Sequence, residues 1–121
     1  IRPSHTYDRT LLPFDPHGAG GTVLSRIQRG RPVVVHGDGT SLWVLTHHRD
    51  FAVGFSGLLG NPAALGEAFH ITSDEALPWN EIFRAIASAV GRNVELVHVP
   101  SAVIARHHPA WGDGLLGDKA H

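Results

Sequence analysis

Apolar positions in the segment 79–90 recur at helical spacing and predict the clearest helix of the chain. They follow the i, i+3, i+4, i+7, i+8, i+11 pattern that places side chains on one helix face: Trp79, Ile82, Phe83, Ile86, Ala87 and Val90. Pro78 suits the entry into such a helix, and Gly91 suits its left-handed end. We therefore predict a helix that begins near Trp79 and buries this stripe in the core.

Three shorter segments show weaker helical patterns, and we expect helices over 22–29, about 47–59 and 101–107. In the second of these, Gly54 and Gly57 each cost about 1 kcal/mol relative to alanine. Two glycines on one helix usually indicate the close approach of another backbone. The segments 8–21 and 109–121 are rich in glycine and proline. We expect a loop over 8–21 and make no assignment over 109–121.

Short apolar and β-branched runs predict the strands. The runs 33–36 and 42–46 flank Gly37-Asp38-Gly39-Thr40, and Asp-Gly is a strong turn signal because glycine tolerates positive φ. We therefore predict a hairpin in which 42–46 returns along 33–36. Two further strands are expected over 68–72 and 94–99.

The residues 1–4 are further expected to be the end of a buried strand. In chain order, the elements are this strand, a helix, the hairpin, a helix, a strand, a helix, a strand and a helix. The predicted fold class is α/β, with short strands, one hairpin and about four helices. At 121 residues the chain fits one domain, so 1–121 is predicted to be a single lobe. Its strands are too short to bury both faces of a large sheet.

Two features indicate a piece of a larger protein. Charged residues make up 17% of the sequence, below the roughly 25% typical of soluble domains, so some surface is expected to face a partner domain. The chain also opens at Ile1 and contains no methionine. We therefore expect a fragment of a longer chain.

The charge balance narrows the classes of partner. A formal net charge of −1 gives no electrostatic basis for binding nucleic acid or an anionic membrane. No apolar run approaches the ~20 residues that span a bilayer. The absence of cysteine removes disulfides and thiolate chemistry and fits a reducing compartment. We therefore expect a cytoplasmic protein with no nucleic-acid partner and no membrane partner.

Ten histidines raise the question of a metal site. The doublets His47-His48 and His107-His108 are poor bidentate sites, because adjacent helical residues point in different directions. Neither doublet has another histidine three or four residues away. We therefore expect no metal, and a free-standing histidine-rich metal module is the least favoured hypothesis.

Three segments carry, in order, a resemblance to a known family. The first is 2–7, RPSHTY; the second is the turn 37–40, GDGT, with the run 46–52, THHRDFA; the third is 69–82, FHITSDEALPWNEI. Together they resemble the C-terminal half of the extended short-chain dehydrogenases/reductases, the NAD-dependent epimerase/dehydratase family. The resemblance covers nearly the whole chain. It implies a Rossmann-type parent whose N-terminal nucleotide-binding half is absent from these residues.

The resemblance places most of the family's chemistry outside this chain. The family's Gly-x-x-Gly-x-x-Gly loop, which lets the backbone approach a pyrophosphate, and its Tyr-x-x-x-Lys pair would both lie upstream. Here Tyr7 is followed at the fourth position by Leu11, and the only lysine is Lys119. We therefore expect no catalytic residue in this chain. The intact parent is expected to use NAD or NADP, and the fragment alone to bind neither.

The resemblance also implies which residues face ligands. It maps Pro3 and Ser4 to the edge of the cofactor, and His5 to the substrate, where an imidazole can hydrogen-bond a hydroxyl and titrate. It maps Val34 and His36 to the strand that lines the substrate. Without the resemblance, Ser4 and His5 are ordinary loop residues.

Trp43 stands where the family usually carries an arginine that pairs with a substrate diphosphate. An apolar ring here replaces a planar cation. The resemblance therefore implies a stacked sugar, an aromatic or a less charged substrate at Trp43. The alternative for this side chain is a core position between the hairpin and a neighbouring helix.

The resulting hypothesis is the substrate-binding portion of an NAD(P)-dependent epimerase, dehydratase or reductase. Its substrate would be a sugar or another small hydroxy or keto compound, and it would be inactive without the N-terminal half. The alternative is a non-catalytic binding or sensor protein of the same fold. An isolated lobe would expose apolar surface, so self-association into a homo-oligomer is also expected.

Overall fold

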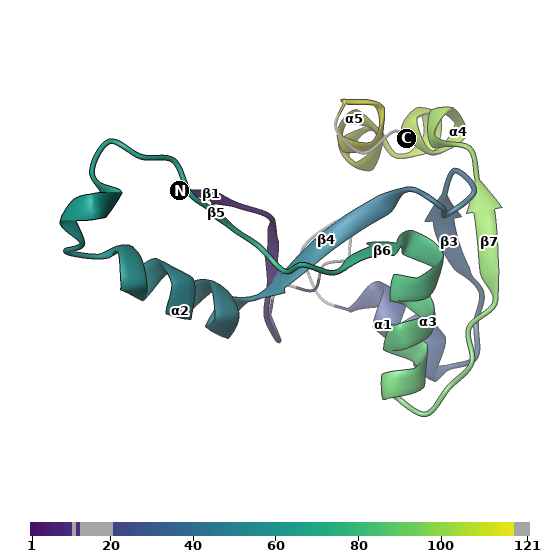
Figure 1. The fold of residues 1–121 in the computed structure, drawn as a ribbon. Coiled ribbons are helices and arrows are strands. Elements are labelled where there is room, and N and C mark those ends of the chain that lie inside the picture. The colour runs from purple at the N-terminus through teal and green to yellow at the C-terminus, as the bar shows by residue number, and fades with distance from the viewer. Residues whose placement is uncertain (11, 13–20, 118–121) are drawn as a thin grey trace. The chain divides into compact units, whose positions relative to one another are not determined.

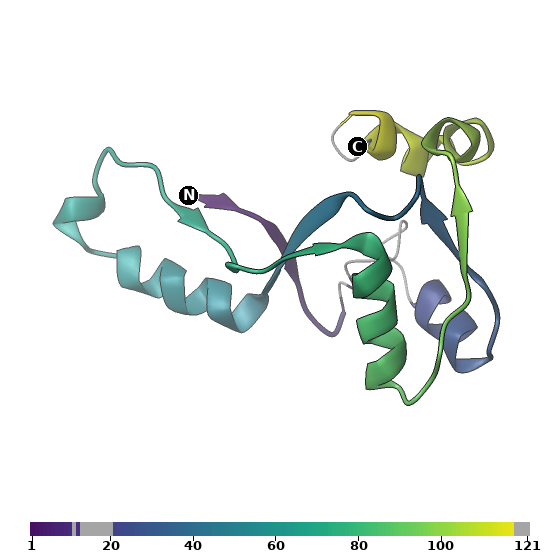
Figure 2. The same cartoon turned by 45° about the vertical axis from the view of Figure 1, so that its right-hand side comes forward.

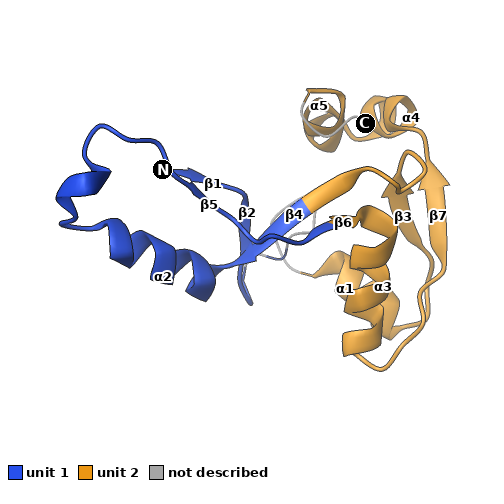
Figure 3. Ribbon diagram, viewed as in Figure 1, with its two compact units in different colours: residues 1–13, 44–76 blue, residues 14–43, 77–121 orange. Residues whose placement is uncertain are grey.

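The computed structural model describes residues 1–10, 12 and 21–117. Most of the loop predicted over 8–21, together with Leu11 and Lys119, lies outside these residues. The chain divides into two compact units (Figure 3). Unit 1 comprises Ile1–Pro13 and Val44–Ala76, and unit 2 comprises Phe14–Trp43 and Leu77–His121. Each unit is described by itself below.

Unit 2 is built around two parallel strands with helices packed against them. Its elements are α1 (Thr22–Gln28), β3 (Val33–His36), α3 (Trp79–Ala89), β7 (Leu96–Val99), α4 (Ser101–His107) and α5 (Pro109–Gly117). β3 pairs with β7 in a register that runs from Val33 opposite Leu96 to His36 opposite Val99. The helices α4 and α5 lie beyond the carboxyl ends of these strands (Figure 1).

The apolar core of the described chain lies in unit 2. Its members come from β3 and from four helices: Ile27, Val33, Val35, Trp79, Ile82, Phe83, Ala87, Ile104 and Leu115. The predicted stripe of α3 supplies four of them, which confirms the helix predicted from the periodicity. Ile86 and Val90 of the same stripe are only partly buried.

Unit 1 contains short strands and one longer helix. Its elements are β1 (Arg2–Pro3), β2 (His5–Tyr7), α2 (His48–Leu58), a 3-10 turn η1 (Pro62–Ala64) and β5 (His70–Ile71). Two further strands, β4 (Leu42–His47) and β6 (Ala76–Pro78), carry the chain from one unit to the other. β1 pairs with β5, and β2 pairs with β4, both in parallel (Figure 2).

The hairpin predicted around Gly37–Thr40 is wrong, although the turn itself forms. Gly37 and Gly39 adopt φ of 58° and 73°, as the turn requires. The strands on either side then pair elsewhere, because β3 pairs with β7 and β4 with β2. The carbonyl of Gly39 accepts from the backbone N–H of Asn80 at 2.9 Å, so the start of α3 binds the turn and the chain does not fold back on β3.

The α/β class is confirmed, and the described residues contain five α-helices where about four were expected. The additional helix is α5, in the tail left without assignment. Gly112 permits it, because a Cβ there would overlap the backbone of Ala105 in α4. The sequence pattern also did not predict β2 and β6, which are strands of three residues each.

Candidate functional site

The predicted cofactor-edge residues lie in unit 1, where β1 gives way to β2. Pro3 ends β1, Ser4 follows it, and His5 opens β2. The hydroxyls of Ser4 and Thr46 lie 2.6 Å apart, and Thr46 Oγ1 also accepts the backbone N–H of Ser73 at 2.9 Å. The buried Thr46 therefore fixes the orientation of the Ser4 hydroxyl. Sequence reasoning missed Thr46, because a threonine at a strand end carries no distinctive signal.

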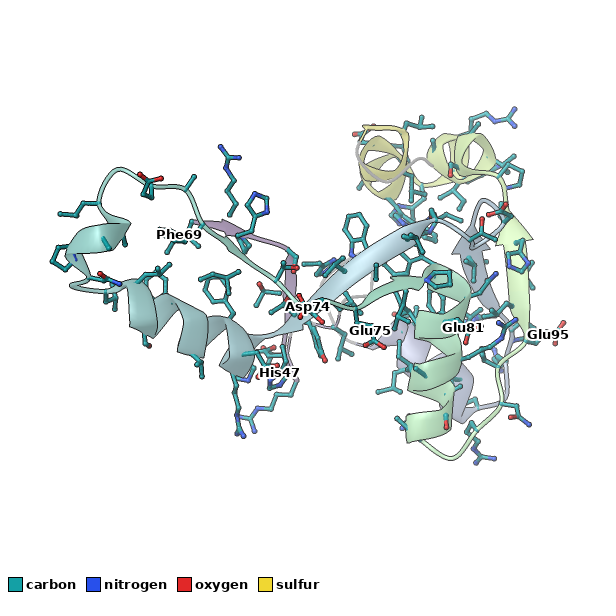
Figure 4. The ribbon with its side chains drawn as sticks, viewed as in Figure 1. His47, Phe69, Asp74, Glu75, Glu81 and Glu95 are labelled. Carbon is teal, nitrogen blue, oxygen red and sulfur yellow. The ribbon has the colours of Figure 1, made fainter. Side chains whose placement is uncertain are left out.

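Tyr7 and His47 meet at the carboxyl ends of β2 and β4. Their rings contact edge to face, with centroids 5.5 Å apart. His47 lies where β4 passes into α2 (Figure 4), and its Nδ1 accepts the backbone N–H of Arg49 at 3.4 Å. This contact makes His47 the N-terminal cap of α2. The single tyrosine thus packs against a helix cap.

His36 and Trp43 lie in unit 2 and meet through a third ring. His36 is only 5% exposed. The ring of Trp79 contacts His36 edge to face at 5.1 Å, and it stacks on Trp43 at 5.8 Å with 29° between the planes. The ring of Trp111 also lies edge to face with His36, with the centroids 6.5 Å apart. We name this group the aromatic cluster: His36, Trp43, Trp79 and Trp111.

Val34 is more exposed than its neighbours in β3. Its side chain is 40% exposed, whereas its neighbours Val33 and Val35 are buried. The β3–β7 register places Val97, also 40% exposed, directly beside it. Val34 and Val97 therefore form a small apolar patch on one face of this sheet.

A hydrogen-bond network holds the turn between His36 and Trp43. The side-chain Nδ2 of Asn80 donates to the carbonyl of Asp38 at 3.0 Å. Because that amide nitrogen is the donor, the Asn80 Oδ1 accepts from His98 Nε2, at 2.8 Å. The backbone N–H of Trp79 donates to the carbonyl of Ser41 at 3.3 Å. The first turn of α3 therefore fixes the path of the chain between the two predicted substrate residues.

The Asp38 carboxylate stabilises the same turn from within. Its Oδ1 accepts the Thr40 hydroxyl at 2.7 Å and the Thr40 backbone N–H at 2.9 Å. The hydroxyl bond, followed by the backbone bond, lowers the pKa of Asp38 below its ordinary value of 3.8. Because the folded value is the lower one, this contribution to stability is present above the ordinary pKa and is lost as pH falls through the lowered pKa.

Removal of the Thr40 hydroxyl should expose this linkage. In Thr40→Val, the pKa of Asp38 should rise toward its ordinary value, as followed by NMR titration of the carboxyl carbon. The destabilisation measured by denaturation should be larger at neutral pH than at a pH below the lowered pKa. Thr40→Ser retains the hydroxyl and should leave both quantities near wild type. An unchanged Asp38 pKa in the valine variant would show that the Thr40 hydroxyl does not lower the pKa of Asp38.

The histidine doublets do not gather further metal ligands. The rings of His47 and His48 lie 4.4 Å apart. Within residues 1–10, 12 and 21–117, no three His, Cys, Asp or Glu side chains come together as a metal site would require.

Among the helices in this part of the chain, none is long and apolar enough to cross a membrane.

Comparison with curated proteins gives two informative relatives, whereas no protein-family model matches the chain. The chain is 35% identical, over 67% of its length, to 2'-dehydrokanamycin reductase of Streptomyces kanamyceticus. It is 30% identical, over 81% of its length, to the chloroplast stem-loop binding protein of 41 kDa b of Arabidopsis thaliana. It spans only 23% and 25% of these two proteins, respectively.

Solved structures with a similar fold identify the fold of this chain. An NAD complex of dTDP-glucose 4,6-dehydratase from Bacillus anthracis matches with a TM-score of 0.66 and 18% identity, over 82% of this chain and 31% of that one. An NAD complex of UDP-glucuronic acid 4-epimerase from Bacillus cereus matches with a TM-score of 0.67 and 18% identity, over 82% and 32%. The chain has the fold of the C-terminal part of NAD-dependent epimerases and dehydratases of the extended short-chain dehydrogenase/reductase type. The resemblance predicted from the sequence is thus confirmed.

Proposed function

We propose that this chain is the substrate-binding part of an NAD(P)-dependent epimerase, dehydratase or reductase that acts on a sugar or another small hydroxy or keto compound. The observation that carries the proposal is the 35% identity with a reductase over two thirds of the chain. The fold shared with two NAD complexes supports it. The chain spans about a third of those structures, so the proposed enzyme includes a nucleotide-binding half besides these residues. Residues 1–121 act in it as one lobe.

The residues of unit 1 fit the edge of a nicotinamide cofactor. Ser4 is partly exposed, and the bond to Thr46 holds its hydroxyl in one orientation, so Ser4 can offer a hydrogen bond to a ligand. Pro3 presents an exposed ring beside it. In the proposed enzyme the cofactor supplies hydride transfer, and Pro3 and Ser4 position its edge while His5 hydrogen-bonds a substrate hydroxyl. No catalytic acid or base is assigned to this chain.

Trp43, His36 and Val34 are the proposed substrate-binding residues of unit 2. Trp43 has one ring face on Trp79 and remains partly exposed. An uncharged ring of this kind packs against the C–H face of a sugar, whereas a diphosphate needs cations. His36 is buried among the indole rings, so its proposed role is to hold this substrate-facing surface in place, and Val34 adds apolar surface. We therefore propose a substrate without a diphosphate group at this position.

Separate assays of the 121-residue chain and of the full-length protein test the proposal. The chain alone should give no heat on titration with NAD or NADP in calorimetry, and it should not turn over a keto sugar. The full-length protein should oxidise or reduce such a substrate with one of the two dinucleotides. In that protein, Ser4→Ala should raise the KM for the dinucleotide more than the KM for the substrate. Tight stoichiometric dinucleotide binding by the 121-residue chain would contradict the proposal that another part of the protein binds the dinucleotide.

A second candidate function is non-catalytic binding on the same fold. The 30% identity with a protein named for binding a chloroplast stem-loop favours it. The net charge of −1 weakens an RNA-binding role for this part of the chain, because phosphate contacts need basic residues. The full-length assay separates the two candidates. Binding of a stem-loop RNA without dinucleotide-dependent turnover would favour the second.

A further inference from the structure

A cavity of about 710 Å³ opens in unit 1. Its described lining comes from the segment that follows β2 and from the junction of β4 with α2: Asp8, Arg9, Thr10, His47, His48 and Arg49. We call this cavity the basic pocket. Small-molecule sites occupy about 300–1,000 Å³. The basic pocket is therefore large enough for a small organic ligand.

The parallel pairing of β2 with β4 brings the two lining segments together. Tyr7 at the end of β2 lies opposite His47 at the end of β4, so both segments leave the sheet at the same edge. The crevice outside the carboxyl ends of parallel strands is where open α/β sheets bind ligands. The predicted cofactor-edge residues Pro3 and Ser4 precede the opposite end of β2, which begins at His5. The basic pocket is therefore separate from the predicted cofactor edge.

Positive charge predominates in the described lining of the basic pocket. Arg9 and Arg49 are exposed, and within the part of the chain that the structure describes neither forms an ion pair with a carboxylate. The one acid among the described lining residues is Asp8. Its Oδ1 accepts both the backbone N–H and the hydroxyl of Thr10, each at 2.7 Å. The acid therefore holds the turn after β2, and the lining keeps an excess of positive charge even with neutral histidines.

The His47 ring is held in place at the basic pocket (Figure 4). It contacts the rings of Tyr7 and His48 edge to face, with centroids 5.5 Å and 4.4 Å away. Its Nδ1 accepts the backbone N–H of Arg49 at 3.4 Å, so the neutral ring carries its proton on Nε2. The pocket thus combines a positioned ring N–H donor with two guanidinium groups.

We propose that the basic pocket binds the phosphate group of a small phosphorylated molecule. A guanidinium group presents a planar fork of N–H donors that matches phosphate oxygens, and two such groups line this one cavity. A phosphate monoester carries a charge of about −1.5 to −2 at neutral pH, which complements the positive excess of the lining. The volume of the cavity leaves room for the organic part of the ligand. This binding site goes beyond the proposed function and does not depend on it.

Calorimetric titration of the full-length protein with inorganic phosphate, at constant ionic strength, tests the proposal. Phosphate should bind saturably. Arg9→Gln and Arg49→Gln should each weaken this binding about tenfold, because each removes charge-assisted hydrogen bonds. Arg106→Gln is the matched control, since Arg106 is exposed, belongs to unit 2 and is not a lining residue. It removes the same charge and should bind phosphate as the wild type does.

Three results would overturn the assignment. They are the absence of saturable phosphate binding, equal phosphate affinities of the three glutamine variants, and binding of malonate as tight as that of phosphate. The second would show that the lining arginines have no special role. The third would show that a dicarboxylate of similar charge fits equally well. Phosphate binding by a full-length protein without dinucleotide-dependent turnover would support the basic pocket and contradict the proposed function, so the two failures are distinguishable.

Discussion

Replacement of Trp79 by alanine is expected to cost unit 2 about 3–5 kcal/mol of unfolding free energy, the range for deleting a buried large aromatic side chain. Trp79 is 5% exposed and contacts His36, Trp43 and Phe83. Its removal leaves a cavity in the core and takes away the ring that joins the two predicted substrate residues. Chemical denaturation followed by circular dichroism measures the loss.

Two variants calibrate this expectation. Trp79→Phe retains an aromatic ring and should cost less than half as much. Trp43→Ala removes a partly exposed ring and should cost about 1–2 kcal/mol, because less apolar area leaves the core. A loss below about 1 kcal/mol for Trp79→Ala would show that Trp79 does not organise the cluster.

Gly39→Ala is the second substitution with a large expected effect, about 3 kcal/mol of destabilisation. The left-handed backbone at φ 73° costs about 1–2 kcal/mol for a residue with a Cβ. A Cβ at Gly39 would also overlap the side-chain amide of Asn80. That amide must then give up its bonds to Asp38 and His98, each worth about 1 kcal/mol.

Gly37→Ala provides the control within the same turn. Gly37 has φ 58°, and a Cβ there would meet nothing within 4 Å. Only the backbone strain of about 1–2 kcal/mol should appear. Thermal or chemical unfolding of both variants checks the difference. Equal losses would show that the contact between Gly39 and Asn80 adds nothing to the stability of the turn.

Local sequence patterns predicted where the helices and strands lie better than they predicted which strands pair with each other. The helix α3 follows from its own periodicity, and α1 and α4 were also expected close to their observed bounds. The hairpin failed because strand pairing is decided by distant residues. β3 pairs with β7, which lies some sixty residues later in the sequence, whereas the turn after β3 is bound by Asn80. α5 was not predicted because its glycine-rich segment has no apolar periodicity. The helix is stabilised by packing on α4.

The candidate site was predictable residue by residue but not as an arrangement. His36 and Trp43 were singled out separately, whereas Trp79 was predicted only as a core residue of α3. The structure makes Trp79 the ring between them. Thr46, which orients Ser4, was not predicted either. The assignments of Pro3, Ser4, His5, Val34, His36 and Trp43 to ligands stay predictions.

The placement of the aromatic residues gives the two units separate optical signals. All three tryptophans, Trp43, Trp79 and Trp111, belong to unit 2, and the single tyrosine, Tyr7, belongs to unit 1. An unfolding curve recorded by indole fluorescence therefore follows unit 2 and does not report the melting of unit 1. A chain judged fully folded by that signal can have α2 frayed in every molecule.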